Sequence, residues 1–334
     1  MKPVETVVVI GSNSFSGADF IDLVLGEREH RVIGVSRSAQ KSALFLPYLG
    51  KARAAGRFEF HQMDLNHDMD RLLALLQRER PEYVVNFAAQ SEVAPSWEHP
   101  EQWFMTNAVA VARLGHFLKD QRWLKRYVHI SSPEVYGSCE GVVREDHRMD
   151  PSTPYAASKA AGDLMLTTLA RHFGLPLVTV RSTNVYGARQ QLFKIIPRTA
   201  IYLRLGRVVE LHGGGGAVKS YIHVRDVSRG ELAAMERGEP GRMYHLSPDA
   251  GVAVRDVVRA LCRISGADFD AATRCVAERL GQDRAYVIDS TRARAELGWS
   301  PRVSLEEGLR EVVDWVSRCW DEIQRESLEY RHKP

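Results

Sequence analysis

Short apolar runs alternate with longer amphipathic stretches over the first two-thirds of this chain. Residues 6–10 (TVVVI) are apolar throughout, and similar runs follow at residues 31–35, 58–62, 83–87, 127–130 and 177–180. Runs of this kind suit strands that are buried on both faces. Their spacing leaves room for a helix after each strand, as in βαβ units. The pattern therefore predicts an α/β fold, a doubly wound parallel sheet with helices on both faces.

The pattern changes after about residue 184. A glycine cluster at 213–216 and short mixed segments predict a smaller and less regular lobe, and residues 305–318 have apolar positions at helical spacing. We expect a nucleotide-binding domain over residues 1–183 with parts of about 217–250. The lobe, which we expect to bind substrate, then takes about 184–216 and 251–330.

Composition narrows the class of protein. The formal net charge of +3 over 334 residues is too small to indicate nucleic-acid or membrane-surface binding. The four cysteines lie far apart and show no metal-ligand spacing, so we expect free thiols and no metal. Without a signal-peptide pattern or an apolar run of about 20 residues, the sequence predicts a cytoplasmic protein.

A glycine-containing turn follows the first strand. Gly11 and Gly17 bracket the segment GSNSFSG, and a helix-like stretch follows over residues 18–25. Such a turn lets backbone N–H groups approach a pyrophosphate, and the helix N-terminus favours the anion. Ser14 stands where a middle glycine is expected, so the turn alone also fits a plain strand–helix connection. Its place at the start of a βαβ array favours a Rossmann-type dinucleotide site.

The end of the second strand indicates which dinucleotide binds. An acidic residue there would bind the ribose 2′-hydroxyl of NAD, but the sequence reads Ser36-Arg37-Ser38. We therefore expect NAD(P), with NADP modestly favoured over NAD. The alternative is that Arg37 is a solvated cation and NAD binds without the acidic contact. Asp64, after the third strand, fits an acceptor for the adenine amino group and equally a turn aspartate.

Tyr155 and Lys159 stand one turn apart at the start of a long helix-like segment. A nearby ammonium and an oxidised nicotinamide both favour the phenolate of a tyrosine. Tyr155 then accepts a hydroxyl proton while hydride leaves the same carbon. Ser132 follows a parallel strand upstream, where such folds bind ligands, and its hydroxyl suits the same substrate oxygen.

Eight motifs now resemble one known family over nearly the whole chain. They are GSNSFSG, AAQSEVAPSWEHP, SSPEVYG, PYAASK, RSTNVYG, KIIP, SYIHVRDV and ELGWSP. The family is the extended short-chain dehydrogenase/reductases that act on nucleoside-diphosphate sugars. The resemblance implies a homodimer packed through two long helices, here about 102–120 and 155–173, and a nucleotide-sugar substrate.

The resemblance also implies the residues of each site. Those implied for the cofactor are Gly11, Asn13, Ser14, Phe15, Gly17, Ser36, Arg37, Ser38, Asp64, Leu65, Phe87, Ala88, Ala89, Gln90, Asn107, Ile130, Tyr155 and Lys159. Those implied for the substrate are Ser91, Glu92, Ser132, Pro133, Glu134, Asn184, Lys194, Ile195, Lys219, Arg279 and Gln282. Lys219 replaces an arginine of related proteins, which keeps the charge and loses the bidentate fork.

Glu134 indicates which reaction of the family to expect. In the 4,6-dehydratases an equivalent glutamate removes the C5 proton after C4 is oxidised. Part of the sequence resembles dTDP-glucose 4,6-dehydratases and part resembles GDP-mannose 4,6-dehydratases. The former carry an acidic residue where this chain has Pro133, so we expect Glu134 to act both as base and as acid. The sequence thus predicts Ser132, Glu134, Tyr155 and Lys159 as the catalytic residues of a nucleotide-sugar 4,6-dehydratase. The alternatives are a 4-epimerase, a uronate decarboxylase, or a non-catalytic nucleotide-binding protein.

Overall fold

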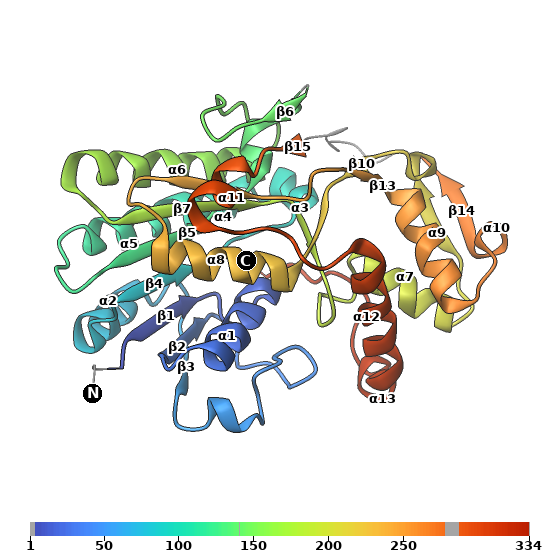
Figure 1. Cartoon of the computed structure of the whole chain (residues 1–334), viewed down its shortest axis with the longest axis horizontal. Coiled ribbons are helices and arrows are strands. Elements are labelled where there is room, and N and C mark those ends of the chain that lie inside the picture. The colour runs from blue at the N-terminus through green and yellow to red at the C-terminus, as the bar shows by residue number, and fades with distance from the viewer. Residues whose placement is uncertain (1–3, 140, 278–286, 334) are drawn as a thin grey trace.

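A seven-stranded parallel sheet forms the centre of the molecule (Figure 1). The computed structural model describes residues 4–139, 141–277 and 287–333. Every pairing in this sheet is parallel. The strand order is β12-β7-β5-β4-β1-β2-β3, so the chain starts in the middle, moves to one edge and then crosses to the other. The strands are β1 (Thr6–Ile10), β2 (Arg31–Ser36), β3 (Phe58–Gln62), β4 (Tyr83–Asn86), β5 (Arg126–Ile130), β7 (Leu177–Ser182) and β12 (Met243–Leu246).

Helices cover both faces of the sheet, as the sequence predicts. One face packs against α1 (Phe15–Glu27), α8 (Val224–Arg237) and α11 (Thr291–Leu297). The other packs against α2 (Met69–Glu79), α5 (Ala110–Leu118) and α6 (Pro154–Phe173). All five residues of β1 are buried, which agrees with a strand covered on both sides. The predicted α/β fold class is therefore confirmed.

The predicted helix over 102–120 differs from the structure in its interior. The helical segment starts earlier, with Pro100 at its first turn, and it contains a π-helical stretch, Met105–Val109, between α4 (Pro100–Phe104) and α5. A short helix, α3 (Val93–Glu98), precedes it. The sequence of this stretch shows no pattern that separates a π-helical turn from a regular helical turn. The sequence analysis therefore could not predict it.

The second part of the molecule is a lobe built from short elements, on the right of Figure 1. Its strands pair only in twos: β8 (Asn184–Tyr186) with β11 (Tyr221–His223), β9 (Val209–His212) with β14 (Thr273–Val276), and β10 (Val218–Lys219) with β13 (Val252–Ala253). A separate apolar core joins its larger helices. The helices are α7 (Ile195–Arg204), α9 (Val254–Ser265), α10 (Phe269–Ala272), α12 (Leu305–Arg318) and α13 (Trp320–Ile323), and a further strand pair is β6 (Val142–Val143) with β15 (Val287–Ile288).

Local sequence fixes the start of α6, the helix that carries Tyr155 and Lys159. The Thr153 side chain accepts a hydrogen bond from the Ala156 N–H, and Pro154 occupies the first turn, where its missing N–H costs nothing. Gly174 ends the helix in a left-handed conformation at φ 70°. The ends of α6 are thus defined by its own residues, which places Tyr155 in its first turn.

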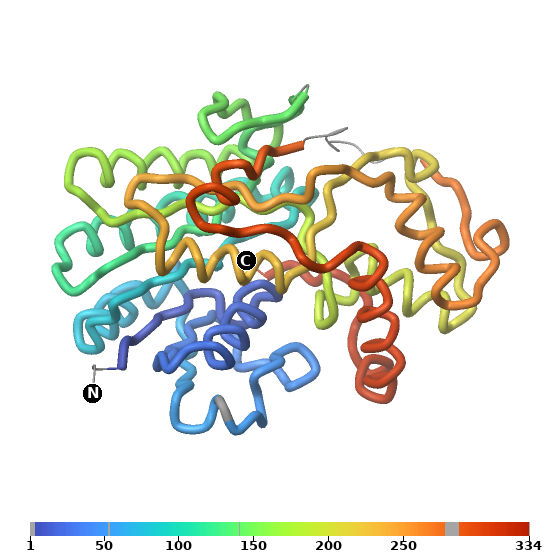
Figure 2. Tube along the Cα trace, viewed as in Figure 1, coloured from blue at the N-terminus to red at the C-terminus, as the bar shows by residue number. Residues whose placement is uncertain are grey.

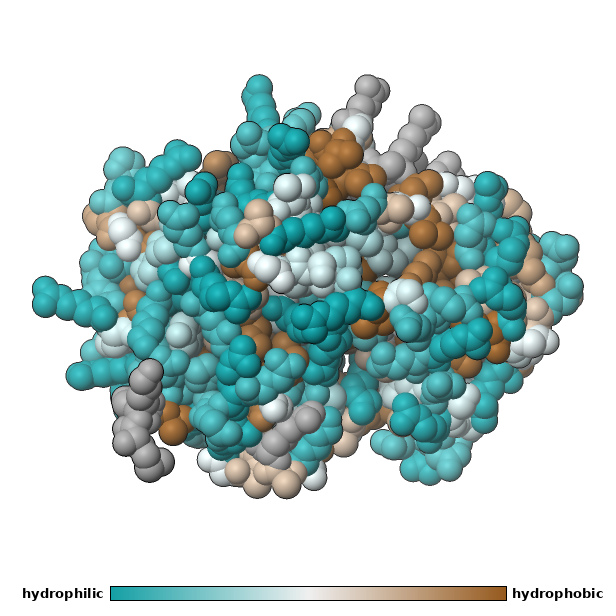
Figure 3. Space-filling view, viewed as in Figure 1, coloured by the Kyte–Doolittle hydropathy of each residue, from teal (hydrophilic) through white to brown (hydrophobic). Residues whose placement is uncertain are grey.

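Hydrophilic side chains cover most of the face shown in Figure 3. Within the described residues, no helix is both long and apolar enough to span a bilayer. Among the same residues, no three histidine, cysteine or acidic side chains are grouped so that they could hold a metal ion.

Candidate active site

The turn after β1 packs tightly against the loop after β4. Gly11 has φ 87°, and a Cβ at this position would lie 2.7 Å from the Ala88 backbone nitrogen. A Cβ on Gly17 would lie 2.5 Å from the carbonyl oxygen of Gly11. Ser14 caps α1 by accepting a hydrogen bond from the Gly17 N–H. Only glycine fits at both ends of the turn, and the N-terminus of α1 therefore opens toward the ends of β1 and β4.

Asn13 holds the loop that follows β2. Its side-chain nitrogen donates to the carbonyl oxygens of Ser38 at 3.1 Å and Ala39 at 2.9 Å, and its backbone N–H donates to the Ser36 hydroxyl at 2.9 Å. Asn13 therefore connects the glycine turn to the segment expected to select the dinucleotide. Asp64 makes an aspartate turn, because its side chain accepts a hydrogen bond from the Asn66 N–H at 2.7 Å. Asp64 also lines the smaller of the two cavities described below.

Asn107 lies behind the loop that follows β4. It exchanges two hydrogen bonds of 2.9 Å with the backbone of Gln90. Asn107 is buried, and like Gly17 it does not line either cavity described below. These two predicted cofactor residues therefore support the site from outside the cavities. Gly17 lies beneath the glycine turn, and Asn107 lies behind Gln90.

A cavity of about 310 Å³ opens at the carboxyl ends of β1, β2 and β4. Most predicted cofactor residues meet there, although they come from distant parts of the chain. The predicted residues that line it are Gly11, Asn13, Ser14, Ser36, Arg37, Ser38, Asp64, Leu65, Phe87, Ala88, Ala89, Gln90, Ser91 and Glu92. The lining residues that the sequence analysis missed include Lys41 and three from the last part of the chain, Tyr330, Arg331 and Lys333.

A second cavity, of about 620 Å³, contains the predicted catalytic residues. It shares Ser14, Phe87 and Ala89 with the first, so the two are continuous. The predicted residues that line it are Ser14, Phe15, Phe87, Ala89, Ser91, Glu92, Ile130, Ser132, Pro133, Glu134, Tyr155, Lys159, Asn184, Lys194, Ile195 and Lys219. Tyr186, Gln190, Gln191 and Phe193 also line it and were missed, because aromatic and amide side chains of this kind carry no chemical signature in the sequence.

Ser132, Tyr155 and Lys159 lie at the end of β5. Lys159 is almost fully buried, and its Nζ donates to the Ile130 carbonyl oxygen at 2.8 Å. Burial lowers the pKa of Lys159 to about 8, although the Asp163 charge acts against this. Burial also raises the pKa of Tyr155, as does the nearby Glu134 charge, whereas a hydrogen bond with Ser132 lowers it. Ser132 and Tyr155 therefore interact directly, and Lys159 lies one helical turn after Tyr155 on α6.

A buried ionic cluster lies next to Lys159, on the side away from Tyr155. Asp163 stands one turn after Lys159 and lies 2.6 Å from Arg181 Nη2 and 2.5 Å from the Ser131 hydroxyl. His129 Nε2 lies 3.3 Å from the same carboxyl group. Burial alone would raise the pKa of Asp163, but Arg181 and His129 hold it below its ordinary value. The sequence analysis missed this cluster, because a polar residue inside a helix or strand does not show that it is buried.

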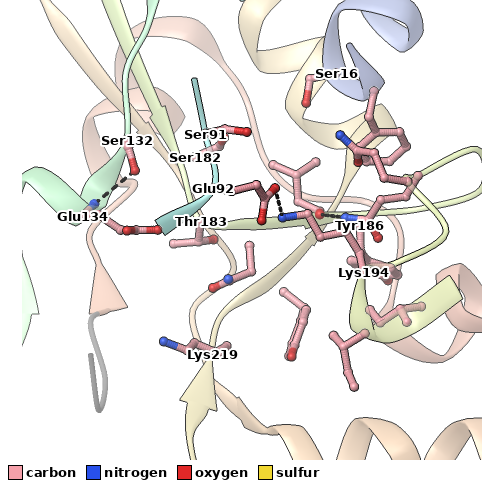
Figure 4. Close-up of a pocket in the computed structure, with 18 of the residues that line it drawn as sticks. Ser16, Ser91, Glu92, Ser132, Glu134, Ser182, Thr183, Tyr186, Lys194 and Lys219 are labelled. Atoms are coloured by element: carbon pink, nitrogen blue, oxygen red, sulfur yellow. Dashed lines mark hydrogen bonds and ion pairs between the residues drawn. The ribbon is translucent and has the colours of Figure 1, made fainter. Parts of the chain in front are cut away.

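The side chain of Glu134 reaches the larger cavity from a short 3₁₀ helix, Pro133–Tyr136 (Figure 4). Ser132 caps that helix by accepting from the Glu134 N–H at 3.3 Å. Across the cavity, Glu92 pairs with Lys194 at 2.7 Å, which joins the loop after β4 to the start of α7. Lys219 enters from β10. Arg279 and Gln282 lie outside the described residues.

The chain matches the family described as GDP-mannose 4,6 dehydratase over residues 8–312. A dTDP-glucose 4,6-dehydratase of Streptomyces griseus is 34% identical over 320 residues, covering 94% of this chain and 95% of the relative. An Arabidopsis thaliana trifunctional UDP-glucose 4,6-dehydratase/UDP-4-keto-6-deoxy-D-glucose 3,5-epimerase/UDP-4-keto-L-rhamnose-reductase is 30% identical over 277 residues. That match covers 82% of this chain and only 41% of the length of the plant protein.

Solved structures resemble the whole chain. The dTDP-glucose 4,6-dehydratase of Streptomyces venezuelae, solved with NAD bound, has a TM-score of 0.84 and 30% identity, and the match covers 94% of this chain and 97% of that one. A UDP-glucose 4-epimerase of Thermotoga maritima, solved with UDP-glucose, has a TM-score of 0.84 and 27% identity, covering 94% and 99%.

The fold and the site together define a Rossmann-fold enzyme of the extended short-chain dehydrogenase/reductase class. Within that class, the chain belongs to the GDP-mannose 4,6-dehydratase family. The predicted family and the predicted enzyme class, a nicotinamide-dependent nucleotide-sugar dehydratase, are therefore confirmed.

Proposed function

We propose that the protein converts a nucleoside-diphosphate hexose into the 4-keto-6-deoxy sugar by oxidation at C4 and loss of water across C5 and C6. One observation carries this proposal. The Glu134 carboxylate lines the same cavity as Ser132, Tyr155 and Lys159, and its charge acts on Tyr155. A base is thus available beside the oxidation site, where a 4,6-dehydration needs one.

The chain's own geometry suits a nicotinamide dinucleotide. The turn from Gly11 to Gly17 leaves no room for a Cβ at either end, and the start of α1 faces the cavity. Its backbone N–H groups suit a pyrophosphate. Bound there, the dinucleotide supplies an acceptor for the C4 hydride and later a donor toward C6. The residues that would hold it are the predicted cofactor residues that line the two cavities.

Four side chains then handle the protons. Ser132 donates to the C4 oxygen, and Tyr155 accepts the C4 hydroxyl proton while the Lys159 ammonium favours the phenolate. Glu134 takes the C5 proton, which the C4 ketone acidifies. Because Pro133 has no proton to donate, Glu134 passes this proton to the departing C6 hydroxyl, which leaves as water. The proton accepted by Tyr155 balances the one that C5 regains.

In this proposal, residues of the lobe bind the sugar nucleotide. Lys194 and Lys219 bring positive charge to the larger cavity, as the diphosphate requires, and Asn184 and Ile195 line the same cavity. Arg279 and Gln282 remain proposed substrate residues. We also propose that a nucleotide-binding domain takes residues 1–183 with parts of about 217–250. The lobe then takes about 184–216 and 251–330, apart from α11, which packs on the sheet.

A panel of nucleoside-diphosphate hexoses followed by mass and NMR tests the reaction. Dehydration gives a product lighter by one water, and turnover with unchanged mass and inverted C4 would indicate a 4-epimerase instead. Loss of carbon dioxide from a uronate would indicate a decarboxylase. The epimerase is the second candidate because a UDP-glucose 4-epimerase has the same fold over its whole length. Absence of turnover across the panel would leave only nucleotide binding.

Replacing Glu134 tests its role. We expect Glu134→Gln to lower dehydration by about 10²–10⁴-fold while C4 oxidation continues, so that reduced nicotinamide accumulates. Glu98→Gln, an exposed change at the end of α3, is the matched control and should keep wild-type turnover. Full dehydratase activity of Glu134→Gln would contradict the assignment.

The preference for NADP over NAD stays a proposal. It is supported by Arg37 and Ser38 at the rim of the smaller cavity, with Lys41 nearby. The related dTDP-glucose 4,6-dehydratase holds NAD and therefore gives no support to this preference. Identification of the dinucleotide released on denaturation decides the matter, and NAD alone would overturn the preference.

A homodimer is also proposed, through the helical segment 100–118 and α6. Both expose large apolar side chains that a monomer would leave in water: Phe104, Met105, Val109, Leu164, Met165 and Phe173. We expect light scattering to give twice the chain mass, and Leu164→Glu to give a monomer. The cytoplasm is the proposed location, where the four free thiols would stay reduced.

A further inference from the structure

The chain returns to the cofactor cavity after it has finished building the lobe. Residues 328–333, here called the strap, follow α13 and run from the lobe toward the middle of the molecule (Figure 2). Leu328 still packs against the apolar core of the lobe. Tyr330, Arg331 and Lys333 line the cavity of about 310 Å³ together with residues that follow β1, β2 and β4.

His332 fixes the strap to the nucleotide-binding part of the molecule. Its ring is within 12° of parallel to the rings of Trp103 and His99, at centroid distances of 5.4 and 5.3 Å. Its Nε2 lies 2.7 Å from the Gln102 side-chain oxygen. Trp103 is fully buried, so this anchor has a rigid base. Stacked rings and a hydrogen bond specify one position for the ring, which a chain merely resting on the surface would lack.

Two further contacts carry the strap to the cavity itself. The Gln90 side chain donates to the Lys333 carbonyl oxygen at 2.8 Å, and Gln90 is the residue whose backbone Asn107 holds. On the other side, the Tyr330 ring meets Phe193 edge-on at 5.4 Å. Phe193 lines both cavities. The strap therefore connects the loop after β4 with the segment that leads into α7.

The strap also brings positive charge. Arg331 and Lys333 join Arg37 and Lys41 around this cavity, opposed among its lining residues by Asp64 and Glu92. Burial lowers the pKa of Lys41, and the charge of Lys333 lowers it further, which places the two ammonium groups close enough to repel. An anionic ligand between them relieves that repulsion. A dinucleotide carries such charge on its pyrophosphate, and NADP also on its 2′-phosphate.

We propose that the strap is part of the cofactor site: it closes the adenosine end of the dinucleotide cavity, and His332 is the positioning residue that holds it closed. The strap is a wall of the cavity and does not fill it. A bound dinucleotide must then displace the strap in order to leave. The reaction proposed above takes hydride from its substrate and returns it, so a dinucleotide retained between turnovers suits it. This inference rests on the proposed function, because it assumes that the cavity holds the adenosine half.

Dissociation rates of NADH and NADPH from the full-length protein test the proposal. Reduced nicotinamide fluorescence reports release when excess oxidised dinucleotide is added. We expect His332→Ala to raise the dissociation rate about tenfold, since it removes two ring contacts and a hydrogen bond. His332→Phe keeps a ring and should restore most of the retention. His116→Ala, a change at an exposed histidine of α5, is the matched control and should behave as wild type.

A second measurement separates a local effect from general loosening. The affinity for dTDP or GDP, whichever the wild type binds more tightly, reports the lobe side of the cleft. We expect His332→Ala to leave it unchanged. An unchanged dinucleotide dissociation rate, or an equal loss of nucleoside-diphosphate affinity, would overturn the strap and leave the proposed reaction standing. A wild-type protein that bound neither NADH nor NADPH would overturn both.

Discussion

The two parts of this molecule fix their functional side chains in different ways. The sheet holds Ser132 at the end of β5, which pairs on both sides over four residues. The lobe holds Asn184 and Lys219 on strands that pair over only three and two residues, each with a single partner among the residues that the structure describes. In the proposed site, the catalytic residues thus lie on a rigid frame, whereas the substrate-binding residues lie on short segments that are supported separately. Changes in the frame should cost turnover or folding, and changes in the lobe should cost affinity.

The largest expected effect is in the frame. Tyr155→Phe removes the proposed proton acceptor and leaves the buried ring in place. We expect kcat to fall by about 10²–10⁴-fold, with dinucleotide affinity within about twofold of wild type. Steady-state kinetics with an accepted nucleotide sugar, beside fluorescence titration with NADH, measures both. Retention of wild-type kcat would remove Tyr155 from the mechanism.

The buried cluster beneath the site should matter next, through stability. Asp163→Asn leaves the fully buried Arg181 without its counter-charge, which costs about 3–5 kcal/mol of unfolding free energy. Asp70→Asn is the control, because the Asp70 side chain is 92% exposed and its pair with Arg113 is worth at most about 1 kcal/mol. Urea unfolding of both variants measures the difference. Equal stability of the two would show that the cluster is not a source of rigidity.

The same cluster predicts how stability changes with pH. The pKa of Asp163 is lower in the folded protein than in the unfolded chain, where it is about 3.9. Its contribution is therefore present above that pH and is lost as the pH falls through the folded value. We expect the acid loss of stability between about pH 4 and 2 to be shallower in Asp163→Asn than in wild type. Parallel curves would contradict this.

A smaller effect is expected in the lobe. Lys194→Ala removes a positive charge from the larger cavity and breaks the pair with Glu92. We expect KM for the nucleotide sugar to rise about tenfold with kcat nearly unchanged, because the proposed role of this residue is to bind the substrate away from the reacting carbons. Arg198→Ala removes another positive charge from the wall of the same cavity, and the KM of this variant provides a comparison. A fall in kcat without a change in KM would erase the contrast between frame and lobe.

The smallest effect concerns the alkaline side of the pH–rate profile. Below its pKa of about 8, Lys159 is an ammonium, and above that pH the charge is lost. In the proposed mechanism this charge favours the Tyr155 phenolate. We expect kcat to decline by a few fold as the pH rises through about 8. Lys159→Arg keeps the charge to higher pH, so its profile should lose this decline even where its overall rate is lower. An identical decline in both proteins would assign it to another group.

The sequence predicted the strands of the central sheet far better than the features that depend on contacts between distant residues. The six apolar runs became six neighbouring strands of one sheet, and helix 305–318 has its predicted ends. The seventh strand, β12, was not predicted as a strand, because MYHL is short and carries His245, whose burial depends on a contact with Tyr136. Periodicity records which residues face a core, and it cannot record a polar side chain that is buried against a distant partner.

The site follows the same division. Motifs identified the residues that meet in the two cavities, because each motif carries a chemical group with a known use. Asp163 and Arg181 were missed, since their burial depends on the packing of α6 against β5 and β7. The strap was missed because EYRHK has no periodicity and no motif, and its place is set by Trp103 and Gln90, more than 200 positions earlier in the sequence.

The π-helical stretch Met105–Val109 sets the phase of a whole helix. Such a stretch amounts to one extra residue in an otherwise regular helix, and each residue turns the helix by about 100°. With that residue, Asn107 faces Gln90 while Leu114, further along, faces the core. A variant in which this stretch became a regular helix could keep only one of these two orientations. Either the loop after β4 would lose the support of Asn107, or the apolar face of α5 would rotate out of the core.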